Sequence, residues 1–243
     1  AEHTITVVVD NTAPTAEIVE PPAEAFLRGA VDVVVRGEYA NLELIELYVA
    51  GELVASWSEA GTHTYSWNTT KVADGSYEIR LVVTDRAGFV SEESITVIVD
   101  NTMPVAEITA PIEGAYVRGA VDVVVRGEDA NLGKIELYVD DALVGEWTES
   151  GEYTYSWDTT EAADGVHVIR LVVIDKAGNE AEASVIVTVD NTSPTAEIVS
   201  PVEGAYLKGD IDVEVRGEDD NLESIELYVA DVLVATWDVS GTH

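Results

Sequence analysis

Residues 166–194 read VHVIRLVVIDKAGNEAEASVIVTVDNTSP, and this stretch decides the fold class. Two runs alternate apolar and polar residues, which is the pattern of β-strands with one buried face. The segment DKAGN (residues 175–179) between them supplies the Asp, Gly and Asn residues of a tight turn. The sequence therefore predicts two antiparallel strands joined by a short turn and followed by a linker that a proline stiffens.

The same arrangement recurs with a period of 90 residues. The hexapeptide VDNTAP begins at Val9, VDNTMP at Val99 and VDNTSP at Val189. A fixed period of this kind marks tandem structural units. We therefore expect residues 1–9 to be the terminal strand of a preceding unit, 10–99 the first repeat, 100–189 the second, and 190–243 a partial third repeat that lacks its last three strands.

Each full repeat contains seven short runs of strand character between Gly, Asp, Asn and Pro turns. In the first repeat they are TAEIV, VDVVVRGE, IELYV, LVASW, YSWNTT, YEIRLVVTD and ESITVIV. Alternation in the second run places Val33 and Val35 in the core and Val34 and Arg36 outside. Seven short strands in about 90 residues predict an all-β fold of tandem immunoglobulin-like, seven-stranded β-sandwiches in a linear array.

Aromatic residues support this prediction. The pairs Tyr65/Trp67 and Tyr155/Trp157 alternate with the same parity as the valines, so we expect them to anchor the cores. A tyrosine two residues before a core position is typical of the corner that precedes the sixth strand of such sandwiches. Tyr77 meets this pattern. The second repeat has His167 at this position, so the sequence does not support the tyrosine hydroxyl hydrogen bond of this corner there.

Acidic residues dominate the charge: 47 Asp and Glu oppose 12 Lys and Arg, and the net charge is −35 at pH 7. Such a chain repels nucleic acid and anionic membranes, so we expect no nucleic-acid partner. We expect no direct membrane insertion either, because no apolar run reaches about 18 residues. Hydrophobic residues make up 47 % of the chain, which is enough for folded cores and unlike an acidic disordered tail.

The run from SWDTT through DKAGN to VDNTSP, with IELYVDDALV before it, resembles the tandem Ig-like repeats of large bacterial and archaeal surface proteins. The resemblance covers the whole chain. It implies an extracellular or cell-surface stalk or adhesive module, often with calcium between its domains, as at cadherin-type joints. The partners it implies are neighbouring Ig-like repeats of the same or another chain, up to a homopolymer.

Three acidic segments are expected to meet at one end of each repeat: the incoming linker, the loop after the second strand, and the turn after the sixth. They offer only oxygen donors, which suit a hard cation such as calcium. The candidate ligands before the second repeat are Asp100, Asn101, Glu128, Asp129, Asn131, Asp175 and Asn179. Those before the third are Asp190, Asn191, Glu218, Asp219, Asp220 and Asn221.

The first repeat has a weaker candidate set, because Tyr39 and Phe89 stand where Asp129 and Asn179 stand in the second. The set comprises Asp10, Asn11, Glu38, Asn41 and Asp85. If calcium binds at the joints, this site is expected to be the weakest or empty. Asp and Asn are also ordinary turn residues, since their side chains mimic a backbone turn. Turn formation alone therefore stays open as the alternative to calcium.

Two tripeptides match the acceptor for N-glycosylation, at Asn68 (NTT) and Asn191 (NTS). Pro194 disfavours the second, and a glycan on Asn191 would compete with a metal there. Catalysis has no support, because the chain has no cysteine and its histidines share no repeat offset with a partner serine or aspartate. These histidines are His3, His63, His167 and His243.

Three functions fit the sequence. The first is a non-catalytic extracellular stalk, structural or adhesive, that calcium stiffens at its joints. The second is a subunit of a self-assembling extracellular filament or sheath, and the third is an accessory sandwich region of a secreted hydrolase. None of the three requires the repeats themselves to be an enzyme.

Overall fold

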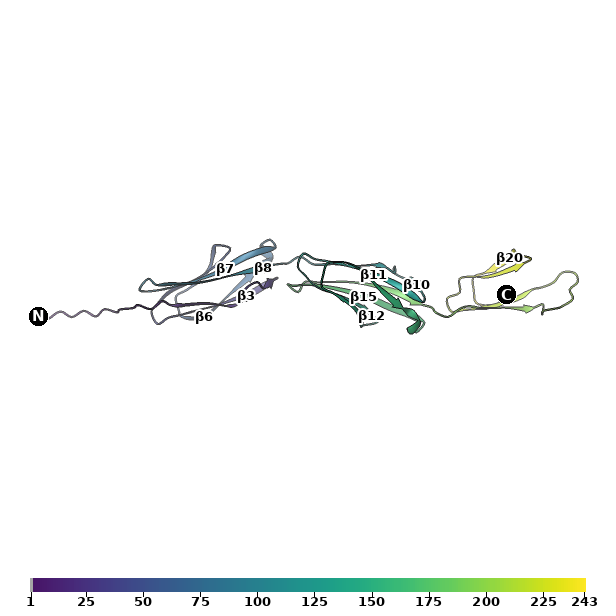
Figure 1. Cartoon of the computed structure of the whole chain (residues 1–243), viewed down its shortest axis with the longest axis horizontal. Coiled ribbons are helices and arrows are strands. Elements are labelled where there is room, and N and C mark those ends of the chain that lie inside the picture. The colour runs from purple at the N-terminus through teal and green to yellow at the C-terminus, as the bar shows by residue number, and fades with distance from the viewer. Residues whose placement is uncertain (1) are drawn as a thin grey trace.

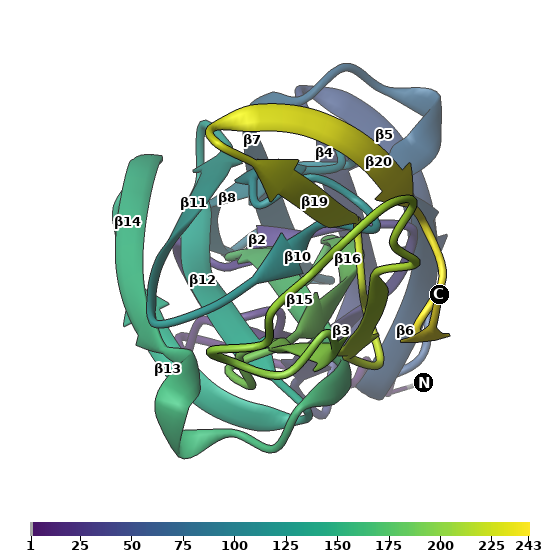
Figure 2. The same cartoon turned by 90° about the vertical axis from the view of Figure 1, so that its right-hand side faces the viewer.

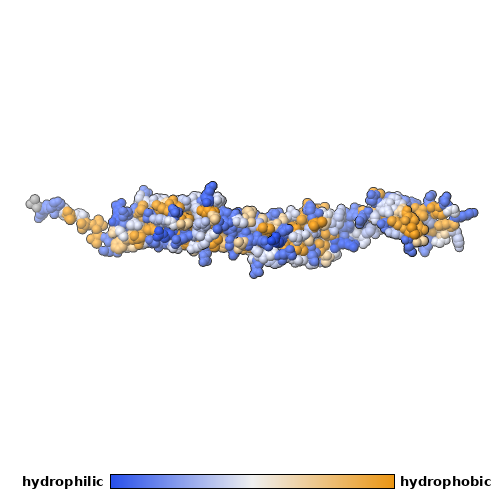
Figure 3. All heavy atoms as spheres, turned by 90° about the horizontal axis from the view of Figure 1, so that it is seen from above, coloured by the Kyte–Doolittle hydropathy of each residue, from blue (hydrophilic) through white to orange (hydrophobic). Residues whose placement is uncertain are grey.

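A computed structural model describes residues 2–243 and places the repeats end to end along one axis (Figure 1). The view along this axis shows the sheets of successive repeats lying behind one another (Figure 2). The space-filling view shows a narrow rod with polar and apolar atoms mixed along its length (Figure 3). The predicted linear array of all-β sandwiches is confirmed.

The first repeat consists of two sheets and a one-turn 3₁₀ helix, η1 (Thr69–Lys71). The smaller sheet has the order β1-β3-β6, with β1 (Thr15–Glu20), β3 (Ala30–Glu38) and β6 (Gly61–Asn68). The larger has the order β2-β8-β7-β4-β5, with β2 (Phe26–Leu27), β4 (Leu42–Val49), β5 (Glu52–Trp57), β7 (Gly75–Asp85) and β8 (Val90–Val99).

The second repeat has the same topology. Its smaller sheet joins β9 (Val105–Ala110), β11 (Ala120–Glu128) and β14 (Gly151–Asp158), and η2 (Thr159–Glu161) follows β14. Its larger sheet has the order β10-β16-β15-β12-β13, with β10 (Tyr116–Val117), β12 (Leu132–Val139), β13 (Ala142–Trp147), β15 (Gly165–Asp175) and β16 (Glu180–Val189).

Each full repeat thus has eight strands, where the sequence predicts seven. The additional strands β2 and β10 have two residues each and pair in parallel with β8 and β16. After the first strand of the smaller sheet, each repeat adds this short strand to the larger sheet and then returns to the smaller one. Two residues are too few to give a recognisable alternation of apolar and polar positions, so the sequence contains no signal for them.

The core has the predicted parity. Val33 and Val35 are completely buried, whereas Val34 is half-buried and Arg36 is exposed. Trp67 is buried in the same core and Tyr65 packs against it. Trp157 and Tyr155 take these places in the second repeat. The aromatic pairs are therefore core anchors, as the alternation predicts.

The corner before the sixth long strand differs between the repeats. The Tyr77 hydroxyl donates a hydrogen bond to the carbonyl oxygen of Ala73 at 2.8 Å. His167 replaces this tyrosine, and its Nε2 lies 2.8 Å from the carbonyl oxygen of Ala163. Its Nδ1 lies 2.5 Å from Asp140 Oδ2. An imidazole with an added carboxylate partner therefore preserves the corner that the sequence left in doubt.

The third repeat contains β17 (Thr195–Ser200), β18 (Glu214–Glu218), β19 (Ile225–Val229), β20 (Val232–Trp237) and β21 (Gly241–Thr242). β21 pairs with β18 as β6 pairs with β3. Two residues of one strand that the sequence assigns as missing are therefore present. Large apolar side chains such as Leu233 and Val234 are exposed here, and Figure 3 shows apolar atoms gathered over this part of the rod.

Residues 2–9 form no strand among the described residues, and that they close a preceding unit, as their likeness to β8 and β16 suggests, stays a prediction. Ile5, Val7, Val8 and Val9 are 72–81 % exposed. β8 and β16 are held by backbone hydrogen bonds to β7 and β15, whereas residues 2–9 pair with no strand among the described residues. A β-strand is defined by hydrogen bonds to a neighbouring strand, and the exposed backbone groups of residues 2–9 can bond to water instead.

Candidate metal centre at the interdomain joints

Three aspartates meet where the first repeat joins the second. Asp100 lies in the linker, Asp129 follows β11, and Asp175 ends β15. One carboxylate oxygen from each lies within 4.8 Å of the other two. Asp100 and Asp175 are buried, at 3 % and 4 % exposure. The predicted convergence of three acidic segments at one point is present in the second repeat.

Two asparagines orient these carboxylates. Asn131 Nδ2 donates to Asp100 Oδ2 at 2.7 Å, and its backbone N–H donates to Asp129 Oδ1 at 2.7 Å. Asn179 Nδ2 donates to Asp175 Oδ2 at 2.6 Å and to the carbonyl oxygen of Asp100 at 3.0 Å. The amide groups therefore hold the acidic oxygens in place and lessen their mutual repulsion.

The electrostatics favour a cation. Burial raises the pKa of Asp129, and repulsion from Asp100, Asp175 and Asp74 raises it further, while a backbone hydrogen bond from Asn131 opposes the shift. Negative charge is thus concentrated at a partly desolvated point. A bound cation would favour the ionised form of all three carboxylates.

The residues present fit calcium. Their donors are all oxygens, and calcium takes such ligands at about 2.4 Å, so ligands across the ion lie about 4.8 Å apart. The separation of at most 4.8 Å between the three carboxylate oxygens meets this condition. Asp100, Asp129 and Asp175 are the residues that would hold the ion.

Three other predicted ligands of the site between the first and second repeats do not point their side-chain oxygens at the three aspartates. Asn101 faces the first repeat, where its Oδ1 accepts from the Gly29 N–H at 2.9 Å. Glu128 pairs with Arg126, with Nη2 and Oε2 2.6 Å apart. Asn179 orients the cluster through its NH₂ group while its oxygen turns away, toward Arg28. These three residues are therefore not ligands in this arrangement.

The equivalent site ahead of the first repeat, around Asp10, lacks the third carboxylate, as the sequence predicts. The Tyr39 hydroxyl donates to Asp10 Oδ1 at 2.5 Å, and Asn41 Nδ2 to Asp10 Oδ2 at 3.3 Å. These bonds, the first above all, lower the pKa of Asp10. Asp85 is fully buried, and its Oδ2 is the one buried side-chain polar atom without a hydrogen-bond partner in residues 2–243. Asn11 and Glu38 are exposed.

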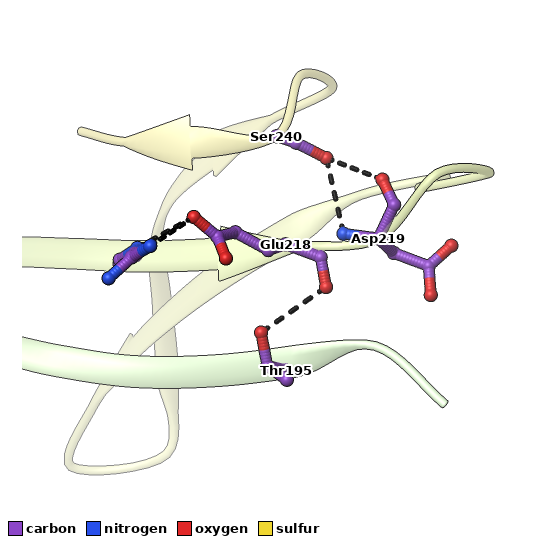
Figure 4. A network of polar contacts seen from close by, with 5 residues as sticks. Thr195, Glu218, Asp219 and Ser240 are labelled. Carbon is purple, nitrogen blue, oxygen red and sulfur yellow. Dashed lines mark hydrogen bonds and ion pairs between the residues drawn. The ribbon is translucent and has the colours of Figure 1, made fainter. Parts of the chain in front are cut away.

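The joint before the third repeat repeats half of the arrangement. Asn221 Nδ2 donates to Asp190 Oδ2 at 3.1 Å, and its backbone N–H to Asp219 Oδ1 at 2.8 Å. Figure 4 shows the Asp219 backbone tied to the Ser240 hydroxyl while its carboxylate points away. The Glu218 carboxylate instead pairs with Arg216. Asp220 is exposed, and the Asn191 amide donates to the Thr159 carbonyl oxygen at 2.9 Å.

Sequence reasoning missed the residues that anchor the linkers. Asp74 Oδ1 accepts from the Asn101 N–H at 2.9 Å, and its Oδ2 accepts from the Thr102 hydroxyl at 2.5 Å. Asp164 makes the same bonds to Asn191 and Thr192. The available signal was the ADG tripeptide that recurs 90 residues apart, just ahead of β7 and β15.

The two predicted glycosylation sites differ in their surroundings. Asn68 is exposed and caps η1, where its Oδ1 accepts from the Thr70 N–H at 3.1 Å. The Asn191 carboxamide is engaged on both sides, because its Oδ1 also accepts from the Gly119 N–H at 3.0 Å. A glycan on Asn191 would break this anchor.

Comparison with known families gives two overlapping matches. Residues 14–81 and 104–171 match the bacterial Ig domain family, and residues 61–136 and 151–234 match the bacterial Ig-like domain (group 3) family. No helix in the described residues is long and apolar enough to cross a membrane.

Two curated relatives are long isoforms of ulvan lyase. The one from Pseudoalteromonas sp. (strain PLSV) is 25 % identical over 63 % of this chain and 18 % of its own length. The one from Alteromonas sp. (strain LOR) is 23 % identical over 51 % of this chain and 13 % of its own length. The chain thus spans less than a fifth of either relative.

Among solved structures, the fibronectin(III)-like modules of Clostridium thermocellum CbhA align with 73 % of this chain and 95 % of their own. Their sequence identity is 21 % and the TM-score is 0.49.

Proposed function

Because the chain belongs to the bacterial Ig domain family, we propose that it is a non-catalytic extracellular stalk, structural or adhesive, whose joints calcium stiffens. The observation that carries the proposal is the Asp100–Asp129–Asp175 cluster, with its oxygens within 4.8 Å of one another. It lies at the boundary between two domains, where a cross-link affects the orientation of one domain to the next.

The three aspartates come from three separate parts of the chain, which hydrogen bonds from Asn131 and Asn179 bring together. Asp100 is in the linker, Asp129 is in the turn between β11 and β12, and Asp175 ends β15. Calcium, when bound, supplies the positive charge that balances them. Their shared ligation would tie the linker to the β11–β12 turn, which connects the two sheets, and to the end of β15 in the larger sheet. We expect these ties to restrict bending at the joint.

A calcium titration of the whole chain tests the proposal. Calcium should raise the melting temperature of the second repeat and narrow the range of shapes seen by small-angle scattering. Binding at a concentration of 100 times Kd stabilises a site by about 2.7 kcal/mol. Asp129→Asn with Asp175→Asn should remove this gain, whereas Asp219→Asn, in the third repeat, should not.

Melting in EDTA separates a loss of calcium binding from a loss of folding in these variants. Asp129→Asn relieves repulsion in the cluster, so it should leave the second repeat at least as stable as the wild type in EDTA. If exchanging EDTA for calcium changes neither melting nor shape in the wild type, calcium does not stiffen this joint.

A second candidate function is an accessory region of a secreted polysaccharide-degrading enzyme. The likeness to two ulvan lyases supports it. A catalytic domain encoded in the same reading frame would favour this role, whereas flanking Ig-like repeats alone would favour the stalk. Both roles keep the repeats themselves non-catalytic.

A further inference from the structure

The first and second repeats also touch through side chains outside the acidic cluster. Arg28, just after β2, donates from Nη1 to Asn179 Oδ1 at 3.3 Å. Lys176 Nζ lies 5.4 Å from the centre of the Phe26 ring. The Arg28 guanidinium also lies against Gly178, since a Cβ placed there would be 3.7 Å from Arg28 Nε. One end of the first repeat thus contacts the β15–β16 turn.

Asn179 is where this contact meets the linker and the second repeat. It is buried, at 4 % exposure. Its oxygen faces Arg28, and its NH₂ group faces Asp175 Oδ2 and the Asp100 carbonyl oxygen. Arginine only donates hydrogen bonds, so Arg28 fixes which way the carboxamide points. Rotation of one repeat against the other would break at least one of these bonds.

The linker is held on both sides of the same joint. Asp100 binds Asn131 of the second repeat, whereas the next residue, Asn101, binds Gly29 and Thr69 of the first. The first repeat is therefore attached at two places, through its linker and through Phe26 and Arg28. Two attachments restrict twisting about the linker in a way that one attachment does not.

We propose that Phe26 and Arg28 form a docking surface for the β15–β16 turn, and that this contact fixes the two repeats relative to each other without a cation. The partner is defined by its chemistry: a tight turn with a basic second residue and a fifth residue that offers a carboxamide. The contact consists only of protein groups, so it goes beyond the calcium stiffening and does not depend on it.

The docking surface recurs, whereas the partner turn differs between the first and second repeats. Tyr116 and Arg118, and then Tyr206 and Lys208, occupy the positions of Phe26 and Arg28. The corresponding turn of the first repeat ends in Phe89, which cannot accept a hydrogen bond from arginine. We therefore expect a joint to be stiffer when the repeat that follows it has an asparagine at the end of this turn, as at Asn179, than when it has a phenylalanine, as at Phe89.

Distance measurements between spin labels test the proposal in the full chain. Since the protein has no cysteine, Ser58→Cys and Thr148→Cys place one label on an exposed position of each repeat. Phe26→Ala with Arg28→Met removes the docking surface. Tyr116→Ala with Arg118→Met is the matched control one repeat later. Each chain is measured in EDTA and in calcium, and circular dichroism checks that both repeats are folded.

In EDTA, the wild type and the control should give one narrow distance distribution, and the Phe26/Arg28 variant a broad one. Arg28 is exposed, and contacts made by exposed charged side chains are weak, so a rise of about fivefold in the undocked fraction is expected, equivalent to about 1 kcal/mol. Arg28→Met alone should broaden the distribution partially, and Arg28→Lys less. Arg28→Met also covers the case in which Phe26→Ala unfolds the first repeat.

Two results would overturn the docking proposal. One is a Phe26/Arg28 variant as narrow as the wild type in EDTA. The other is a wild type that is already as broad as the variant in EDTA and narrows only with calcium. Failure of the calcium proposal looks different, because calcium would then change none of the distributions while the docking variant stays broader than the wild type.

Discussion

At the scale of single residues, Asp85 shows how one difference between the repeats leaves a buried carboxylate oxygen without a hydrogen-bond partner. Its counterpart Asp175 has Oδ2 bonded to the Asn179 amide at 2.6 Å. Phe89 replaces that asparagine in the first repeat, and Asp85 Oδ2 is left buried without a partner. A buried polar atom in this state costs about 1–3 kcal/mol.

Phe89→Asn should therefore stabilise the first repeat by about 1–3 kcal/mol, because the new amide can donate to Asp85 Oδ2. Calorimetry of the whole chain in EDTA, with the transitions of the repeats resolved, measures the gain. Asn179→Phe is the converse change and should destabilise the second repeat. An unchanged first transition in Phe89→Asn would mean that the Asp85 oxygen is satisfied in another way.

His167 makes the stability of the second repeat depend on pH. Burial lowers its pKa, but the acceptors at the Ala163 carbonyl and Asp140 outweigh this effect and raise it above 6.5. A raised folded-state pKa contributes stability that is fully present below the unfolded pKa of about 6.5 and is lost as pH rises through the folded value. The second repeat should thus melt lower at pH 8 than at pH 6.

His167→Tyr provides the matched control, since Tyr77 makes the same corner bond in the first repeat. The variant should abolish the pH dependence between pH 6 and 8. Thermal melting at several pH values, followed in EDTA, compares it with the wild type. Equal pH profiles for the two proteins would contradict the assignment to His167.

At the scale of strands, the VRGE motif explains a close approach between the sheets. A Cβ on Gly127 of β11 would lie 2.5 Å from Ile135 Cδ1 of β12, and Ile135 is completely buried. Gly37 and Gly217 face Ile45 and Ile225 in the same way. Only glycine fits at this point of the second long strand.

Gly127→Ala should therefore destabilise the second repeat by about 1–3 kcal/mol, the usual cost of overpacking a tight core. Chemical denaturation followed by tryptophan fluorescence measures the loss. Arg126→Ala, on the solvent side of the same strand, should change stability less. An equal effect of the two substitutions would show that the close approach is not what requires glycine.

The strands and their inward faces could be predicted because period-two alternation is a local signal. The candidate site could be predicted only in part, since Asp100, Asp129 and Asp175 converge as expected but Asn101 and Glu128 do not. Successive residues of an extended chain point to opposite sides, so Asn101 faces away from the cluster that Asp100 joins. Assigning whole loops to a site ignores this alternation.

At the scale of the whole molecule, the repeats are alike in fold but unequal at their joints. The joint before the second repeat combines three carboxylates with the Arg28–Asn179 contact. The one before the first repeat has Tyr39 and Phe89 at two of these positions. We therefore expect the stiffness of a chain of such repeats to vary along its length, according to a few residues in two loops.

Asp100 and Asn101 are bonded to opposite repeats, and their Cα atoms are about 3.8 Å apart. The linker is therefore bound to both repeats at almost the same point. When the two ends of the rod are pulled apart, we expect these hydrogen bonds to resist extension of the joint before the sandwiches unfold.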